Sequence, residues 1–392
     1  MTDTVTIRSA EPQADEVLQV SFSDGHTTGY HFVWLRHDLF FPTAQGAKSG
    51  DATPSFPDAP GAVTPRHIDT AGDTLAIDWS DGRATRHDAA WLRRHAYDRT
   101  TRQAARHRPV LWDSRMGNGL PALGYDRVAA GDDGRLAVAR QVRDYGFARL
   151  TNVPTSPGTV AQVAGLFGVP SQGKHGPVSE IKVDSAFNYG GTEVTEFLPL
   201  HTDNNYGYYP PGISFFHCLA ANPGGGDSFL ADGFAIAMAL RDESEEAFDL
   251  LASTPLPYSI QSDDLDYRAH GRTITLDGDG NLAGIRFSDR ALDPLDVPPD
   301  QVRPVYDALA RWVRLLHDPR FQIRYHMEPG DMSVYDNQRI LHGRTYYEPG
   351  QGLRHMQSCF VSRQHFHSEL RVLLKAVGAA DADLWLAEGA RG

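Results

Sequence analysis

The chain has very little cysteine: its 392 residues contain only Cys218 and Cys359. Both cysteines lie in apolar, strand-like runs, which is typical of buried free thiols in a reducing compartment and not of a disulfide framework. The chain also lacks any stretch close to the roughly 18 apolar residues that a membrane-spanning helix needs. Its first residues show no basic region followed by an apolar run, the pattern of a secretory signal. We therefore expect a cytoplasmic protein without a membrane partner.

Lysine is scarce as well, and negative charge predominates. Among 37 basic residues the only lysines are Lys48, Lys174, Lys182 and Lys375, and the formal net charge is −13. A chain of this charge has no basic face with which to neutralise phosphates, so nucleic acid is not an expected partner. Hydrophobic residues make up 41% and charged residues 22%, which is ordinary for a globular protein. The length suits one large domain or two ordinary ones.

Short strand-like runs separated by turn residues dominate residues 1–100, which we interpret as a small β-rich N-terminal domain. A short helix is expected at Ala89–His95, and strands are expected at Val5–Arg8, Val17–Phe22, His31–Leu35, Ala62–Ile68 and Thr74–Trp79. Residues 101–125 are rich in Arg, Gly and Pro, which is typical of a connector.

Residues 126–392 are expected to form the second domain. Apolar spacing predicts helices at Leu136–Tyr145, Thr159–Phe167, Gly233–Arg241, Glu245–Leu251 and Val302–His317. Strands are expected at Phe147–Leu150, Ile213–Ala220, Met332–Tyr335 and Met356–Val361. Strands surround the polar clusters and helices lie outside them, which favours a mainly β fold, a β-sandwich or jelly roll packed by helices.

The most informative local motif is His201-Thr202-Asp203. On an extended backbone, residues i and i+2 point to the same face, so an imidazole and a carboxylate can converge on one ion. A mononuclear Fe(II) oxygenase needs two histidines and one carboxylate on one face of the metal, with the other positions open. His342, which follows the expected strand at Met332–Tyr335, is the leading candidate for the third ligand. The alternative is a satisfied surface pair, with His342 as a buried, hydrogen-bonded residue.

A second group of residues raises the odds of the oxygenase interpretation. Arg354 stands at the start of a strand-like run, where its guanidinium can hold the distal carboxylate of a dicarboxylate cosubstrate bidentately. Ser228, just after a glycine turn, could offer a hydroxyl to the same carboxylate. Alone, Arg354 would more often be an ordinary ion-pairing arginine. The oxygenase interpretation therefore rests on the metal motif and the cosubstrate residues occurring together in this order.

These motifs together resemble the gamma-butyrobetaine hydroxylase-like branch of the TauD/TfdA family of Fe(II)/2-oxoglutarate dioxygenases. The resemblance covers nearly the whole chain. In the first domain it rests on VWLRHDLF (33–40) and AAWLRRHAYD (89–98). In the second it rests on RDYGFARLTNVP (143–154), LPLHTDNNYGYYPPGISFFHCL (198–219), GGGDSFLADGF (224–234) and YDNQRILHGRTYYEPGQGLRHMQSCFV (335–361).

The resemblance implies a double-stranded β-helix, that is a jelly roll, as the catalytic domain. It implies that His201, Asp203 and His342 ligate iron and that Arg354, helped by Ser228, anchors 2-oxoglutarate. Because Asp203 is present, the chain does not resemble the halogenating relatives. The implied reaction uses O2, releases succinate and CO2, and hydroxylates an unactivated C–H bond of a small molecule. Relatives in this branch are commonly homodimers, so a homodimer is a possible assembly.

The chain departs from the family pattern in two segments. Many relatives carry a zinc site in the N-terminal domain, but HDLFFPTAQGAKSG (37–50) contains no cysteine, so we expect no zinc. Betaine hydroxylases enclose a trimethylammonium group in an aromatic cage. Here the corresponding segment reads SQGKHGPVSEIKV (171–183): an expected Trp falls near Ser179, a Tyr position falls near His175, and the ammonium of Lys174 would repel a cationic substrate.

Other side chains remain available for the substrate. Tyr206 and Asn204 follow the metal motif, Tyr189 precedes it where a lid is expected, and Phe360 lies six residues after Arg354. Each aromatic of this set is more often a core residue than a contact. Lys174 and His175 complete the group of substrate candidates, with a solvated loop lysine as the plainer interpretation of Lys174.

Four functions compete on this sequence. The favoured one is hydroxylation of a small carboxylated or amino-acid-like metabolite, with a biosynthetic pathway as its expected setting. The second is hydroxylation of gamma-butyrobetaine or trimethyllysine in carnitine biosynthesis, which the incomplete cage disfavours. The third is a non-catalytic β-helix binding domain, which the intact ligand and anchor set argues against. The fourth is a hydrolytic metal site, for which no general base lies beside the ligands.

Overall fold

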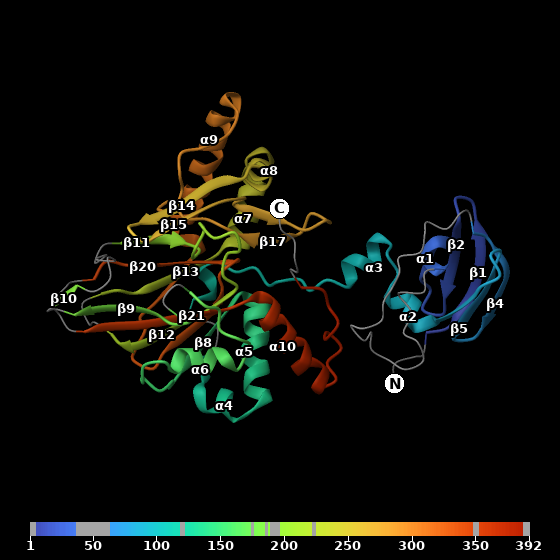
Figure 1. Cartoon of the computed structure of the whole chain (residues 1–392), viewed down its shortest axis with the longest axis horizontal. Coiled ribbons are helices and arrows are strands. Elements are labelled where there is room, and N and C mark those ends of the chain that lie inside the picture. The colour runs from blue at the N-terminus through green and yellow to red at the C-terminus, as the bar shows by residue number, and fades with distance from the viewer. Residues whose placement is uncertain are drawn as a thin grey trace. The chain divides into compact units, whose positions relative to one another are not determined.

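The computed structural model describes residues 5–36, 63–117, 122–173, 176–184, 187–188, 197–221, 225–347 and 353–386. The chain divides into two compact units, Met1–Arg106 and His107–Gly392 (Figure 1). Among the described residues, no helix is long and apolar enough to cross a membrane. Cys218 and Cys359 are both buried free thiols.

The first unit contains two small antiparallel sheets with short helices. One sheet has the order β1-β2-β3 and the other the order β4-β5-β6. The element bounds are β1 Ile7–Gln13, β2 Val17–Phe22, β3 Thr27–His31, α1 Phe32–Arg36, β4 Pro65–Ala71, β5 Thr74–Trp79, β6 Ala84–Asp88, α2 Ala89–Arg94 and α3 Arg99–Ala104. Alternate residues of β2 and β5, among them Leu18, Val20 and Ile77, are buried in one core with Tyr30 and Trp79, as expected of strands with one solvated face.

One expected strand of this unit is wrong. The run His31–Leu35 was expected to be extended, but β3 ends at His31 and the helix α1 begins at Phe32. The buried residues of α1 are Phe32, Leu35 and Arg36. Their spacing of three and four places them on one helical face, whereas a strand would turn Phe32 and Leu35 to opposite sides.

The second unit is built on two sheets. The major sheet has the order β10-β9-β21-β12-β19-β8-β7, and the minor sheet has the order β11-β20-β13-β18. The strands of the major sheet are β7 Leu123–Gly124, β8 Phe147–Thr151, β9 Ser179–Asp184, β10 Phe187–Asn188, β12 Ile213–Ala220, β19 Met332–Asp336 and β21 Arg354–Val361. Those of the minor sheet are β11 Leu198–His201, β13 Ser228–Asp232, β18 Gln322–Tyr325 and β20 Ile340–Arg344.

The two sheets pack face to face as a jelly roll. Leu230 and Ile323 from the minor sheet share one buried cluster with Phe147 and Tyr335 from the major sheet. Every described pairing is antiparallel except β7 with β8. Interior-facing side chains therefore alternate along each strand with side chains that face outward. The fold is mainly β with flanking helices, which confirms that part of the expectation.

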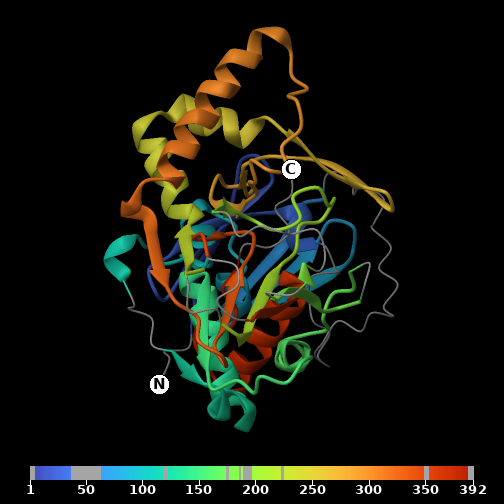
Figure 2. The same cartoon turned by 90° about the vertical axis from the view of Figure 1, so that its left-hand side faces the viewer.

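Helices cover the outer faces of both sheets. The helices are α4 Tyr125–Ala130, α5 Asp132–Tyr145, α6 Thr159–Gly165, α7 Gly233–Glu243, α8 Glu245–Ser253, α9 Pro299–Leu316 and α10 Arg363–Ala376. Residues of α5, α6 and α10 form one core with Phe215 and Val361 of the major sheet. Residues of α7, α8 and α9 form another core with Phe229 and Leu341 of the minor sheet. Figures 1 and 2 show these two helical groups on opposite sides of the sheets.

Two further hairpins lie between α8 and α9 and were not expected from the sequence. They pair β14 Leu256–Ser262 with β15 Leu265–Gly271, and β16 Ile274–Leu276 with β17 Leu282–Ile285. Two short 3-10 helices, Ser114–Met116 and Pro319–Phe321, complete the described elements of this unit.

Candidate iron and cosubstrate site

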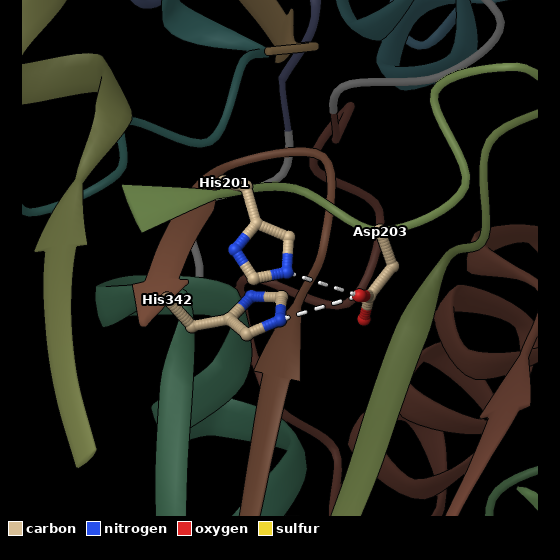
Figure 3. A group of neighbouring side chains, drawn as sticks. All are labelled: His201, Asp203 and His342. Atoms are coloured by element: carbon tan, nitrogen blue, oxygen red, sulfur yellow. Dashed lines mark ion pairs between the residues drawn. The ribbon is translucent and has the colours of Figure 1, made fainter. Parts of the chain in front are cut away.

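His201 and His342 come from neighbouring strands of the minor sheet. β11 ends at His201, and His201 lies directly opposite His342 on β20. The two imidazole rings are 4.4 Å apart between centroids. Asp203 lies two residues after the end of β11, and its carboxylate points toward both imidazole rings (Figure 3).

One carboxylate oxygen stands close to both rings. Oδ1 of Asp203 is 3.6 Å from Nε2 of His201 and 3.4 Å from Nε2 of His342. One potential ligand atom of each residue lies within 4.8 Å of the others, and no second such group of His, Cys, Asp or Glu occurs in the part of the chain described here. Two imidazoles and one carboxylate that converge in this way are the donor set of a non-haem Fe(II) site, which keeps its other positions open.

The tautomer of His201 suits a metal ligand. Its Nδ1 lies 2.9 Å from the carbonyl oxygen of Pro199. A carbonyl oxygen can only accept a hydrogen bond, so Nδ1 carries the proton and Nε2 keeps its lone pair for the ion. This contact also orients the ring, as hydrogen bonds behind metal-ligating histidines generally do.

The site favours an ionised carboxylate and a neutral imidazole. Burial opposes the charge on Asp203, but the nearby His342 and His201 outweigh burial and hold the pKa of Asp203 well below its usual value. Burial lowers the pKa of His342, against the attraction of Asp203. These are the protonation states in which both groups can bind a divalent cation.

Asn337 holds the main chain of Asp203 in place. Its side-chain Oδ1 accepts a hydrogen bond from the Asp203 N–H at 2.7 Å, and its Nδ2 donates to the Asp203 carbonyl at 3.2 Å. Asn337 is fully buried and belongs to the turn between β19 and β20. The turn that leads to one predicted ligand, His342, thus fixes the backbone of another, Asp203. Asn337 stands within the motif YDNQRILHGRTYYEPGQGLRHMQSCFV (335–361), but no role was predicted for it from the sequence.

Arg354 and Ser228, the predicted cosubstrate anchors, line one small cavity. Its other lining residues are Cys218, Ala221, Gly225, Gly226, His326, Met327 and Met356. Burial, and after it the charge of Arg344, lower the pKa of Arg354 to about 10. At physiological pH Arg354 is still a cation. Within the described chain it has no acidic partner, and its Nη1 has no hydrogen-bond acceptor. A buried guanidinium in this state suits an incoming carboxylate.

Arg344 is a second buried arginine that the sequence analysis missed. It lies two residues after His342 on β20, opposite Ser228 on β13. The Tyr347 ring lies under both guanidiniums, 4.5 Å from Cζ of Arg344 and 5.5 Å from Cζ of Arg354. The i, i+2 spacing from His342 could have revealed it, because such residues share one face of a strand.

The predicted substrate residues have different positions. Asn204 is exposed, with a positive φ of 51°, and Tyr206 is half-buried and donates its hydroxyl to Oδ1 of Asn204 at 2.8 Å. Phe360 is half-buried on β21, in the same alternating set as Arg354. Lys174, His175 and Tyr189 lie outside the described residues. So does the segment 37–50, for which no zinc was expected, and that expectation stays a prediction.

The jelly roll with a His–Asp–His group at one strand pair and a buried arginine in an adjacent cavity defines a class, the mononuclear non-haem Fe(II) oxygenases that use a 2-oxo acid. Comparison with known proteins gives the same class. The model of the taurine catabolism dioxygenase TauD, TfdA family matches residues 119–360.

Named relatives extend the similarity over most of the chain. Gamma-butyrobetaine dioxygenase of Pseudomonas sp. (strain AK-1) is 32% identical, over 91% of this chain and 93% of its own. Gamma-butyrobetaine dioxygenase of Homo sapiens is 27% identical, over 95% and 98%. Mitochondrial trimethyllysine dioxygenase of Rattus norvegicus is 27% identical, over 88% and 82%. The chain belongs to the TauD/TfdA dioxygenase family and is an Fe(II)/2-oxoglutarate-dependent dioxygenase.

Proposed function

We propose that this dioxygenase hydroxylates an unactivated C–H bond of a small carboxylated or amino-acid-like metabolite. In this proposal His201, Asp203 and His342 hold Fe(II), and Arg354 with Ser228 holds the distal carboxylate of 2-oxoglutarate. The observation that carries the proposal is that the second unit contains both a group of metal-ligand type and a buried cation, unpaired among the described residues, beside a cavity. A convergent His–Asp–His group lies on β11 and β20, and the buried cation of Arg354 faces a cavity that Ser228 also lines.

Bound iron with 2-oxoglutarate and O2 would supply the oxidation, with succinate and CO2 as coproducts. The chain's own residues bind and orient. Asp203 and the two imidazoles would supply only three ligands to the metal, Asn337 fixes the main chain of Asp203, and Arg354 sets the direction of the cosubstrate. The apolar side chains of Met327 and Met356 exclude water from the wall beside the distal carboxylate.

Asn204, Tyr206 and Phe360 are the described candidates for substrate contact, with Lys174, His175 and Tyr189 beside them in the proposal. Asn204 and Tyr206 directly follow Asp203 and are joined by a hydrogen bond. Phe360 lies on the same face of β21 as Arg354 and belongs to none of the described hydrophobic cores. Both observations support a role for Phe360 in substrate contact.

A second candidate function is hydroxylation of gamma-butyrobetaine or trimethyllysine, because the relatives that match over most of the chain carry those names. Against it stands the segment SQGKHGPVSEIKV (171–183), which lacks the aromatic residues expected of a quaternary-ammonium cage and contains Lys174. We keep the non-quaternary metabolite as the first choice.

Three further properties belong to the proposal. Residues 1–100, which fall within the first unit, are proposed to form a separate N-terminal domain, and the resemblance to the branch suggests a homodimer. Two buried free thiols support a reducing compartment such as the cytoplasm. Light scattering coupled to gel filtration would test the dimer.

The first experiment is to load the anaerobic apoprotein with Fe(II), add 2-oxoglutarate and record the visible charge-transfer band of the complex. The band should form in the wild type and be absent from His201→Ala and Arg354→Ala. No band in folded, iron-loaded wild-type protein would overturn the proposal. A panel containing gamma-butyrobetaine, trimethyllysine and non-quaternary amino and carboxylic acids, scored by succinate release, then separates the two candidate functions.

A further inference from the structure

Arg286 is a buried arginine directly after β17, and it contacts the loop that follows Asp203. Its Nε donates to the carbonyl oxygen of Asn205 at 3.0 Å, and Nη2 donates to the carbonyls of Asn205 and Gly207, the latter at 2.9 Å. The remaining terminal nitrogen, Nη1, donates to the carbonyl of His270 at 3.4 Å. The Arg286 side chain therefore joins the loop Asp203–Gly207 to His270, near the end of strand β15.

Arg286 has no acidic partner among the described residues, and its hydrogen-bond acceptors are backbone carbonyl oxygens. Desolvating a guanidinium without a counter-ion is costly, and burial lowers the pKa of Arg286. The guanidinium also lies over the ring of Tyr258, 5.3 Å from its centroid. A simple packing residue would avoid this cost, so the arrangement points to a need for rigid donors at this place.

Gly271 leaves the space that Arg286 occupies. A Cβ at Gly271 would lie 2.6 Å from both Cδ and Cζ of Arg286 and closer still to Nη1. Its backbone does not require glycine, because no positive φ occurs there. Gly271, at the end of β15, is therefore explained by the close approach of the guanidinium. Glycine is needed there because it has no side chain, and not because of its backbone conformation.

The hairpin β14–β15 reaches the same loop through aromatic side chains. Tyr258 of β14 donates its hydroxyl to the carbonyl of Arg286 at 3.2 Å. Tyr267 of β15 stacks on Tyr206, with ring centroids 6.1 Å apart. Tyr206 in turn holds Asn204 by a hydrogen bond. Loop and hairpin thus meet at two places, with Arg286 as the polar connection and Tyr206–Tyr267 as the aromatic one.

We propose that Arg286 is a positioning residue that couples the loop Asp203–Gly207 to the hairpin β14–β15, so that the two form one wall on the substrate side of the iron. Asn337 fixes the start of this loop at Asp203, and Arg286 fixes its continuation at Asn205 and Gly207. The assignment of this wall to the substrate rests on the proposed function; the mechanical coupling does not.

Hydrogen–deuterium exchange of the apoprotein tests the coupling without iron, cosubstrate or substrate. Arg286→Met should speed exchange at least tenfold in peptides that cover residues 202–209 and 256–271, with other protected segments unchanged. Gly271→Ala should give the same local pattern, because it displaces the guanidinium and leaves the loop's own residues intact. Arg286→Lys, which keeps the charge but loses the fork of donors, should lie between wild type and Arg286→Met.

Arg143→Met is the matched control, since Arg143 is similarly buried but contacts Asp144 and Asp381, away from the loop. It should leave exchange in both peptides at the wild-type rate. Unchanged exchange in Gly271→Ala, or equal acceleration in Arg143→Met, would overturn the proposal even if Arg286→Met fails to fold. A wild type without the Fe(II)–2-oxoglutarate band refutes the proposed function instead and leaves the exchange result valid.

Discussion

His201 and His342 face each other as a register pair of the antiparallel strands β11 and β20. The two histidines are far apart in sequence, and the hydrogen-bonded ladder alone brings their rings to a centroid separation of 4.4 Å. A site built on paired strands is more exact than one built on loops, because strand register fixes both Cα positions. The third residue, Asp203, lies beyond the end of β11, where strand register no longer fixes its position. There Asn337 holds the main chain of Asp203 by hydrogen bonds.

Replacing Asn337 with alanine should weaken iron binding while the protein stays folded. The variant loses both hydrogen bonds to the main chain of Asp203, so the carboxylate is no longer held against the two imidazoles. Loss of such outer-sphere support typically lowers metal affinity about 10–100-fold. Anaerobic Fe(II) titration would measure it. Gln338→Ala is the control, because Gln338 donates to Pro210 and Pro211 and not to Asp203; equal affinities in both variants would refute the role of Asn337.

Replacing Arg354 with lysine should weaken 2-oxoglutarate binding more than iron binding. Lysine keeps a positive charge but cannot form two parallel hydrogen bonds to one carboxylate. We expect the 2-oxoglutarate concentration at half-saturation of the visible band to rise by at least about tenfold. Arg324→Lys, on the exposed side of β18, serves as the control. A half-saturation point like that of wild type would show that Arg354 is not the anchor.

Breaking the buried ion pair of Arg339 and Asp232 should destabilise the second unit severely. The two side chains are almost completely buried and form two hydrogen bonds, at 3.0 and 2.8 Å. Asp232→Asn leaves the guanidinium without its counter-ion, which costs about 3–5 kcal/mol. Urea denaturation would measure the loss. The exposed pair Arg303–Asp307 gives the comparison: Asp307→Asn should change stability by less than about 1 kcal/mol, and a similar loss in both would contradict the prediction.

Stability of the second unit should fall with acid through His217. Burial lowers the pKa of His217 from 6.5 to about 4, so between these values the unfolded chain binds more protons than the folded one. Stability is therefore fully present above about pH 6.5 and is lost as the pH falls toward 4, by up to about 3 kcal/mol. Denaturation curves at several pH values should show this slope in wild type and in the exposed-residue variant His365→Gln. His217→Leu should reduce the slope, and an unchanged slope would rule His217 out.

Local patterns in the sequence predicted the helices α5 to α9 and the strands β8, β12, β19 and β21 of the second unit, but not the minor-sheet strands β11, β13, β18 and β20. The strand Ile213–Ala220 was predicted with the observed bounds, because apolar residues there run between two turn-forming segments. The helix α9 was predicted within a few residues from its apolar spacing. The hairpin β14–β15 escaped prediction, because outward-facing polar residues such as Gln261 and Asp266 break its apolar pattern. The helix α1 was mistaken for a strand, since a run of five residues carries too little periodicity to separate the two.

The sequence by itself determined the family and predicted the ligand types of the site, because His201, Asp203, His342 and Arg354 occur in order within recognisable motifs. Only the tertiary structure decided which side chains fix the backbone around these predicted ligands. Asn337 reaches Asp203 across 134 positions of sequence, and Arg286 reaches Asn205 across 81. The physical reason is that an i, i+2 spacing fixes which face of a strand a residue occupies, whereas a hydrogen bond between distant segments depends on register, turn geometry and the space that a residue such as Gly271 leaves open.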